Sequence, residues 1–302
     1  MRTAMLAPAL ALTLTGAFAS AAAADEKYSD GLQAVGLTVG QQLVSFSVDA
    51  PSSTRSRAHV HGLKGDRKLV GIDFRVQNGK LYGVGDKGGI YTLSGDAKAN
   101  KVSQLTVALQ GKNFGVDFNP AANRLRVISD TGQNLRHNID DPAAPRTTTV
   151  DGTLTNPAVA PSTTPTTALG VTGAAYTNND LNTATATTLF DIDTTNDRVS
   201  LQSPANAGTL APTGGLGVNA SPSAGFDIYY APKTGTNQGF AALKVNGTYG
   251  FYRVNILNGA AERLGAFPSN RQVFDVALPL DQGRATPRGG MDTGGGMIGS
   301  LK

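Results

Sequence analysis

One short pattern recurs along the chain and restricts the folds that the chain can adopt. It consists of Gly-x-Asp and an apolar residue, followed after a short turn by a second apolar strand. Complete copies lie at residues 71–74, 115–118 and 225–228. Two altered copies lie at residues 173–176, where Ala175 replaces the aspartate, and 273–276, where Val273 replaces the glycine. Short strands and turn signals follow the first copies, which indicates four-stranded β-meanders.

The spacing of the copies predicts how these meanders are arranged. Successive copies begin 44, 58, 52 and 48 residues apart, which is typical of β-propeller blades. The last copy has no further strands after it, and the strands expected at 33–48 have no first strand. We therefore predict an all-β chain, a single β-propeller of about five four-stranded blades, in which the N- and C-terminal strands share one blade. Six blades, or a large repeating β-sandwich, are the alternatives.

The composition agrees with an all-β chain and excludes some kinds of site. Glutamate occurs only as Glu26 and Glu262, and turn-forming residues are plentiful. The chain has no cysteine, so it has neither disulfides nor thiolate metal sites. The net charge of +4 comes without a basic stripe interleaved with aromatic residues, so we expect no nucleic-acid partner.

The two ends of the chain differ from the repeat. Residues 1–24 resemble a cleavable signal peptide, with Arg2, an apolar stretch at 5–18 and alanines at 22–24. No cysteine follows, so a lipoprotein anchor is excluded, and no later stretch is long enough to span a membrane. We expect a propeller domain at 25–281 and a Gly-rich disordered tail at 282–302. The protein is thus expected to be extracytoplasmic, secreted or in the cell envelope, and monomeric.

The repeated aspartates are the candidate ligand- or ion-binding residues: Asp73, Asp117, Asp227 and Asp275. If the repeat forms the innermost strand of each blade, these acids lie near the axis. Two such charges repel by about 4 kcal/mol at 4 Å. The acids therefore either hold a hard cation such as Ca²⁺ or each bond backbone amides of an adjacent blade. We prefer the second interpretation, which Ala175 slightly favours.

Other patterns give weaker signals. Residues 191–197 resemble the start of a calcium loop, but Asn196 stands at the glycine position, so a hairpin turn with acidic caps is preferred. His59 and His61 would share one face of a short outer strand expected at 58–61, and His137 is the only other histidine. We expect exposed histidines there and assign no metal, cofactor or catalytic residue.

Several segments together resemble a known bacterial family, catalogued as domain of unknown function 4394. They are residues 70–75, 81–83, 114–120, 124–130, 132–136, 173–178, 188–193 and 225–228. The resemblance implies secreted or cell-envelope proteins with a propeller-like repeat. It implies no activity, cofactor or catalytic residue.

Three hypotheses of function follow. The first is a secreted binding or scaffolding module that contacts a protein or glycan partner through loops on one face. The second is a hydrolase of glycans or lactones that uses Asp73, Asp117 or Asp227 as acid, base or ion ligand. The third is a Ca²⁺-stabilised structural protein. Because no catalytic constellation is visible, we prefer a binding module and leave the question of catalysis open.

Overall fold

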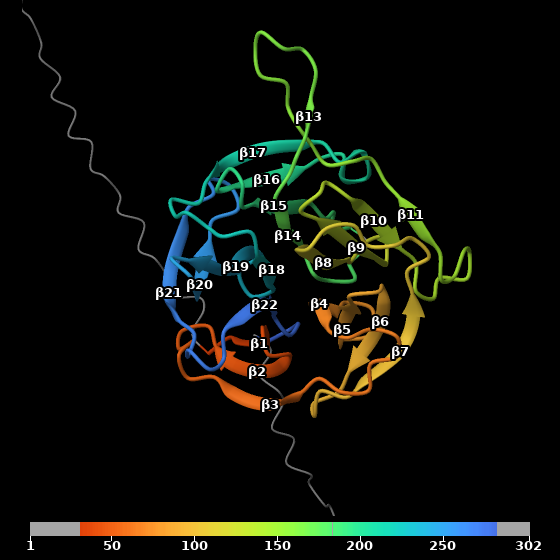
Figure 1. Ribbon diagram of the computed structural model, residues 1–302, viewed down its shortest axis with the longest axis vertical. Coiled ribbons are helices and arrows are strands. Elements are labelled where there is room, and N and C mark those ends of the chain that lie inside the picture. Colours follow the sequence, from red (N-terminus) through yellow and green to blue (C-terminus); the bar gives the residue numbers. More distant parts are fainter. Residues whose placement is uncertain (1–30, 183, 283–302) are drawn as a thin grey trace, which may run out of the picture.

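The computed structural model describes residues 31–182 and 184–282, and these form a ring of five four-stranded antiparallel sheets around one axis (Figure 1). The signal peptide expected at 1–24 and residues 283–302 of the expected tail lie outside the described residues. Within the described part, no helix has the length and apolar character needed to cross a bilayer. The ring confirms the predicted five-bladed propeller; the six-bladed and sandwich alternatives are wrong.

Four blades are each built from one continuous stretch of chain. The first two contain β4 (Leu69–Arg75), β5 (Lys80–Gly85), β6 (Gly89–Leu93) and β7 (Ala99–Gln104), then β8 (Phe114–Asn119), β9 (Arg124–Ser129), β10 (Asn134–His137) and β11 (Thr148–Val150). The next two contain β14 (Val171–Tyr176), β15 (Leu189–Asp193), β16 (Arg198–Gln202) and β17 (Leu210–Gly215), then β18 (Ala224–Ala231), β19 (Thr236–Val245), β20 (Thr248–Val254) and β21 (Ala261–Ala266). A small hairpin of β12 (Thr155–Asn156) and β13 (Thr166–Thr167) extends outward from the ring (Figure 1).

The fifth blade joins the two ends of the chain. Its strand order is β22-β1-β2-β3, built from β22 (Val273–Ala277), β1 (Gln33–Thr38), β2 (Gln42–Ser47) and β3 (Arg55–His59). Leu37 pairs with Asp275 across the β1–β22 ladder. The last strand of the repeat thus completes a blade begun by the first strands, as predicted.

Apolar side chains fill the spaces between neighbouring blades. In one such space Phe46 of the closing blade meets Phe251 and Phe267 edge to face, at centroid distances of 5.0 and 5.2 Å. The inner strands are buried on both faces, since each blade packs against two others. This burial explains why the inner strands read as nearly continuous apolar runs.

The repeated glycines allow neighbouring inner strands to approach closely. A Cβ placed on Gly71 would lie only 2.5 Å from Cγ2 of Val116, and one on Gly225 would collide with the backbone of β22. In β22 itself Val273 replaces the glycine, and there the space is provided by Gly36 of β1, where a Cβ would lie 2.7 Å from Cγ1 of Val273. At each of these close contacts, one of the two strands therefore contributes a glycine.

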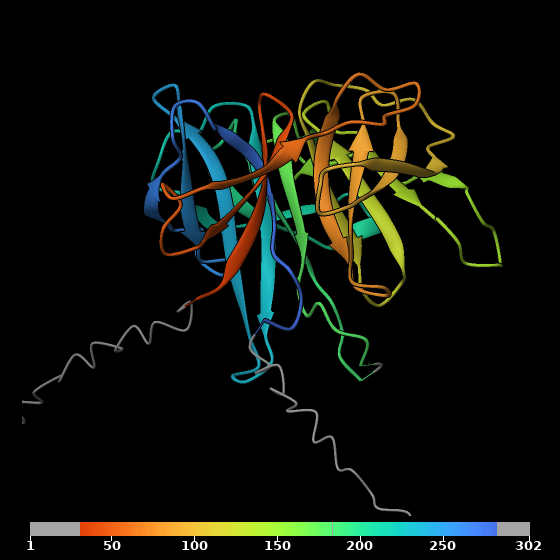
Figure 2. The same ribbon diagram turned by 90° about the horizontal axis from the view of Figure 1, so that it is seen from below.

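Both ends of the described chain leave the ring on the same face (Figure 2). There, the side chain of Gln282 accepts a hydrogen bond from the Gln33 N–H at 2.6 Å and donates one to the Gln33 carbonyl at 2.8 Å. The inner strand β22 runs toward this face. The opposite face, where the inner strands begin, is therefore free of the chain ends.

Candidate functional site

The four predicted aspartates occupy the hub of the ring. Asp73, Asp117, Asp227 and Asp275 lie on the inner strands β4, β8, β18 and β22, and none is more than 7% exposed. The structure brings three of them together: carboxylate oxygens of Asp73, Asp117 and Asp227 lie within 4.8 Å of one another.

Each hub carboxylate accepts a hydrogen bond from a backbone N–H of the next inner strand. The four bonds run from Ile72 to Asp275 at 2.7 Å, from Phe118 to Asp73 at 2.8 Å, from Tyr176 to Asp117 at 3.2 Å and from Leu278 to Asp227 at 2.6 Å. Every seam between inner strands except that between β14 and β18 carries one of these bonds. The geometry agrees with the preferred interpretation, in which the aspartates bond amides of adjacent blades.

Burial raises the pKa of all four hub carboxyls. The pKa of Asp227 rises to about 6. For Asp73 and Asp117 the neighbouring carboxyl groups add to the effect of burial, and the pKa values of both lie well above their usual range. Burial thus makes the charged form of each hub carboxyl less favourable than it is in water.

The blade that lacks the aspartate closes its seam differently. Ala175 is fully buried and packs with Phe190, Phe226 and Ile228 between β14 and β18. A carboxyl in this position would be surrounded by apolar side chains. This seam is therefore held by apolar packing where the other four have a carboxylate.

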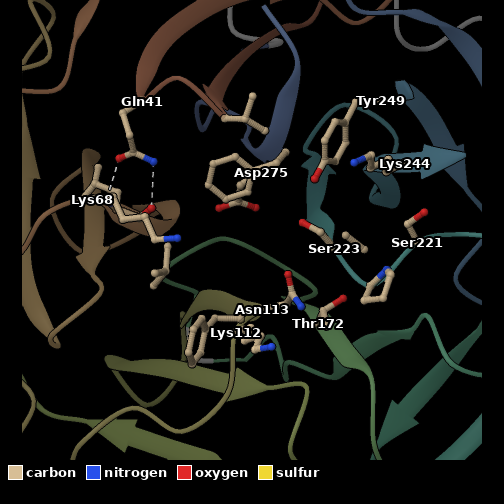
Figure 3. Close-up of a pocket in the computed structure, with 17 residues that line it drawn as sticks. Gln41, Lys68, Lys112, Asn113, Thr172, Ser221, Ser223, Lys244, Tyr249 and Asp275 are labelled. Carbon is tan, nitrogen blue, oxygen red and sulfur yellow. Dashed lines mark hydrogen bonds between the residues drawn. The ribbon is translucent and has the colours of Figure 1, made fainter. Parts of the chain in front are cut away.

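A cavity of about 370 Å³ opens on the axis at the face where the inner strands begin (Figure 3). All five blades contribute to its wall, and Asp275 is the one hub acid that lines it. The lining comes mostly from the first residues of the inner strands and the loops before them: residues 68–70, 112–114, 172, 221–224, 274 and 275, together with residues 39, 41, 244 and 249.

The cavity wall combines positive, polar and apolar groups. Three lysines, Lys68, Lys112 and Lys244, come from different blades. Asn113, Ser221 and Ser223 add hydrogen-bonding groups, and Phe114, Phe274 and Tyr249 add ring surfaces (Figure 3). Sequence reasoning did not identify any of these residues as part of a cavity: Phe114 and Phe274 belong to the repeat, and the others lie in loops and strand ends that carry no motif.

The histidines are not gathered at one site. His59 is exposed on β3 and contacts the side chain of Gln42, and His61 is exposed as well. Since β3 ends at His59, the expected strand at 58–61 and the shared strand face were wrong. His137 is buried between Ser103 and Thr148, and burial lowers its pKa to about 4.

The acidic segment at 191–197 forms a hairpin turn, as preferred from the sequence. Asp193 ends β15, and its carboxylate accepts hydrogen bonds from the Thr195 and Asn196 N–H groups at 3.0 and 2.9 Å. Asp191 is fully buried within the blade, and neither of its carboxylate oxygens has a hydrogen-bond partner among the described residues. The two acids therefore do not form a calcium loop together.

One buried polar network adjoins the hub and lies outside the cavity: Arg126 pairs with Asp117 across the β8–β9 ladder. Arg126 is 1% exposed and donates hydrogen bonds to Asn134 and Asp151 at 2.7 Å, and to Asn206 at 2.8 Å. It also reaches the hydroxyl of Tyr176 in the next blade. This network ties the blade of β8–β11 to the blade of β14–β17.

The fold and the hub define a five-bladed β-propeller with an axial cavity. Residues 42–277 match the family model described as Domain of unknown function (DUF4394), so the chain belongs to this family. No curated protein matches the chain in sequence.

Several solved structures share part of the arrangement. An auxiliary nutrient binding protein from Bacteroides ovatus is 12% identical, with a TM-score of 0.40 over 70% of this chain and 56% of that one. A protein from Lactobacillus plantarum is 16% identical, with a TM-score of 0.41 over 78% and 66%. YCF48 bound to D1 peptide is 13% identical, with a TM-score of 0.32 over 74% and 60%. The chain spans between 56% and 66% of the length of these structures, and likenesses this distant carry no argument about its function.

Proposed function

We propose that the protein is an exported binding module whose ligand occupies the axial cavity. The observation that carries this proposal is the cavity itself, about 370 Å³ in volume and lined by all five blades. Cavities of roughly 300–1,000 Å³ with an apolar wall and a few convergent polar groups are typical ligand sites. The N-terminal segment that resembles a signal peptide supports export.

The walls of the cavity are held in place before any ligand arrives. Asp275 in its floor is bonded to Ile72, and the Gln41 side chain bonds both the N–H and the carbonyl of Leu69, at 2.7 and 3.1 Å (Figure 3). A preformed site loses little conformational entropy when a ligand binds. This rigidity favours a binding role.

The hydrolase hypothesis has less support. A glycosidase needs two carboxyl groups about 5–9.5 Å apart on either side of the scissile bond. Among the described residues that line the cavity, Asp275 is the one carboxylic acid. Asp73, Asp117 and Asp227 do not line it, and Glu262 lies on the outer strand β21. Glycoside hydrolysis in this cavity would therefore need a second acid that the described lining does not present.

The proposal can be tested by plugging the cavity. We would screen a library of small fragments against the mature protein by ligand-observed NMR and repeat the screen with Ser223→Trp, which places a large side chain in the cavity wall. Ser52→Trp is the matched control, because Ser52 is exposed on a turn outside the cavity. We expect hits that disappear only in Ser223→Trp. If every hit is retained in the plugged variant, the cavity is not the binding site and the proposal fails.

A further inference from the structure

We infer that the ligand of the axial cavity is a small organic molecule with an anionic oxygen group, held by Lys68, Lys112 and Lys244. This inference rests on the proposed function and adds the chemical class of the ligand.

Basic side chains outnumber acidic ones in the wall of the cavity. Three lysines line it, no arginine does, and Asp275 is its only acid among the described residues. The carboxyl of Asp275 is buried and bonded to Ile72, and burial raises its pKa well above the usual range. None of the three lysines forms an ion pair with a described residue; the recorded ion pairs use arginine. The cavity wall therefore carries three basic side chains and one acidic side chain, an excess of basic groups.

Contacts with the rest of the protein anchor each lysine or the backbone next to it. The N–H groups of Lys112 and Asn113 both donate to the carboxylate of Asp130, at 3.0 and 3.2 Å. Lys68 precedes Leu69, whose backbone is held on both sides by Gln41. The ammonium group of Lys244 lies over the ring of Tyr249, 5.7 Å from its centroid.

The three lysines lie around one cavity. They come from three regions of the ring that are far apart in sequence, and they surround the cavity in Figure 3. Positive groups that line a concave surface reinforce one another, because the low-dielectric walls focus the field. Lys80, by contrast, is an exposed lysine that does not line the cavity.

The remaining lining residues describe the rest of the ligand. Ser221 and Ser223 can donate hydrogen bonds to anionic oxygens. Phe114 and Phe274 also line the cavity and suit an apolar or ring-shaped body. Lysines act as point charges and do not require the planar, bidentate geometry that arginine selects, so both a carboxylate and a phosphate group fit.

The test uses three probes with the same ring and different charge: benzoate, phenyl phosphate and uncharged benzamide. Each is titrated against the mature protein by calorimetry or NMR at low salt. We expect both anions, or one of them, to bind at least tenfold more tightly than benzamide, and we expect their binding to weaken as salt is added. The tighter of the two anions identifies the preferred group.

Substitution of the lysines completes the test. Lys68→Gln, Lys112→Gln and Lys244→Gln should each weaken the binding of the anion several-fold, and the triple variant should remove the preference over benzamide. Lys80→Gln, an exposed lysine outside the cavity, should change nothing. Unchanged melting temperatures would show that the variants are folded.

The outcomes separate the inference from the proposed function. Suppose that only benzamide or other neutral fragments bind, and that Ser223→Trp abolishes this binding. The cavity then binds ligands, but the inference of an anionic ligand is wrong. If the anions bind equally well to Ser223→Trp or to the triple lysine variant, the inference is also wrong. If nothing binds in a manner sensitive to the plug, both the inference and the proposed function fail.

Discussion

The carboxylate of Asp275 accepts a hydrogen bond from the backbone N–H of Ile72 at 2.7 Å, across 203 residues of sequence. Asp275 lies on the last strand of the chain and Ile72 on the inner strand of the first complete blade. The bond therefore helps to close the ring where its two ends meet. The same aspartate lines the axial cavity, so one side chain contributes both to the closure of the ring and to the cavity wall.

Replacing this aspartate should weaken the ring. Asp275→Ala leaves the N–H of Ile72 without its acceptor, which costs about 1–3 kcal/mol for a buried group. Asp275→Asn keeps an oxygen in the same place and should cost less. Denaturant unfolding followed by circular dichroism measures the difference. Equal stability of wild type and Asp275→Ala would show that the bond does not stabilise the ring.

The hub should make the protein less stable as the pH rises from about 4 to 6. Folded Asp227 keeps its proton up to about pH 6, whereas the unfolded chain releases it near pH 3.8. In this window the folded state binds more protons, so the free energy of unfolding decreases with pH. For Asp227 alone the decrease is on the order of 3 kcal/mol.

His137 contributes the opposite pH dependence of stability. Burial lowers the pKa of His137 to about 4, so between that pH and 6.5 its contribution makes the folded state more stable as pH rises. Four raised carboxyls should outweigh one imidazole. Melting temperatures measured from pH 4 to 7 test the sign, and Asp227→Asn should flatten the curve. A curve that rises throughout this range would contradict the assignment.

The close contact at Gly225 should not tolerate a side chain. A Cβ at this position would collide with Cα of Asp275 and lie 2.7 Å from the carbonyl oxygen of Phe274, and both are backbone atoms of β22. We expect Gly225→Ala to destabilise the fold by about 1–3 kcal/mol through overpacking. Gly95→Ala is the matched control, because a Cβ there has no neighbour within 4 Å. Similar unfolding midpoints for the two variants would refute the steric argument.

Calcium should have no effect on stability. Asp73 accepts N–H bonds from Phe118 and Phe74 with its two oxygens, and Asp117 and Asp227 each use one oxygen in the same way. Shared protons can neutralise the remaining charge. We therefore expect the same melting temperature with Ca²⁺ and with a chelator. A rise with Ca²⁺ that Asp117→Asn abolishes would support the calcium-stabilised alternative, since a ligand at 100 times its dissociation constant adds about 2.7 kcal/mol.

Export predicts a defined new N-terminus. If residues 1–24 form a cleavable signal peptide, the full chain expressed in a bacterial host should appear outside the cytoplasm, beginning at Asp25. Cell fractionation and intact-mass measurement test this directly. If the protein stays in the cytoplasm with the mass of the full chain, the export part of the proposed function is wrong.

Much of the fold could be predicted because its determinants are local and repeated. The Gly-x-Asp pattern marks each inner strand, and its spacing sets the number of blades. The unpaired copy at 273–276 was sufficient to predict that the two chain ends share a blade, because an open sheet edge is unfavourable. The placement of the aspartates near the axis followed from the same pattern.

The cavity and its lysines depended on the tertiary structure. Lys68, Lys112 and Lys244 lie in loops or at a strand end, with no common motif, and only the closed ring brings them around one hollow. The role of Gly36 beside Val273 was likewise invisible, because it depends on the register of two strands at opposite ends of the chain. Local sequence determines which segments become strands and where they repeat. Which side chains face one another across the axis is decided by contacts between residues far apart in sequence, and these form only when the ring closes.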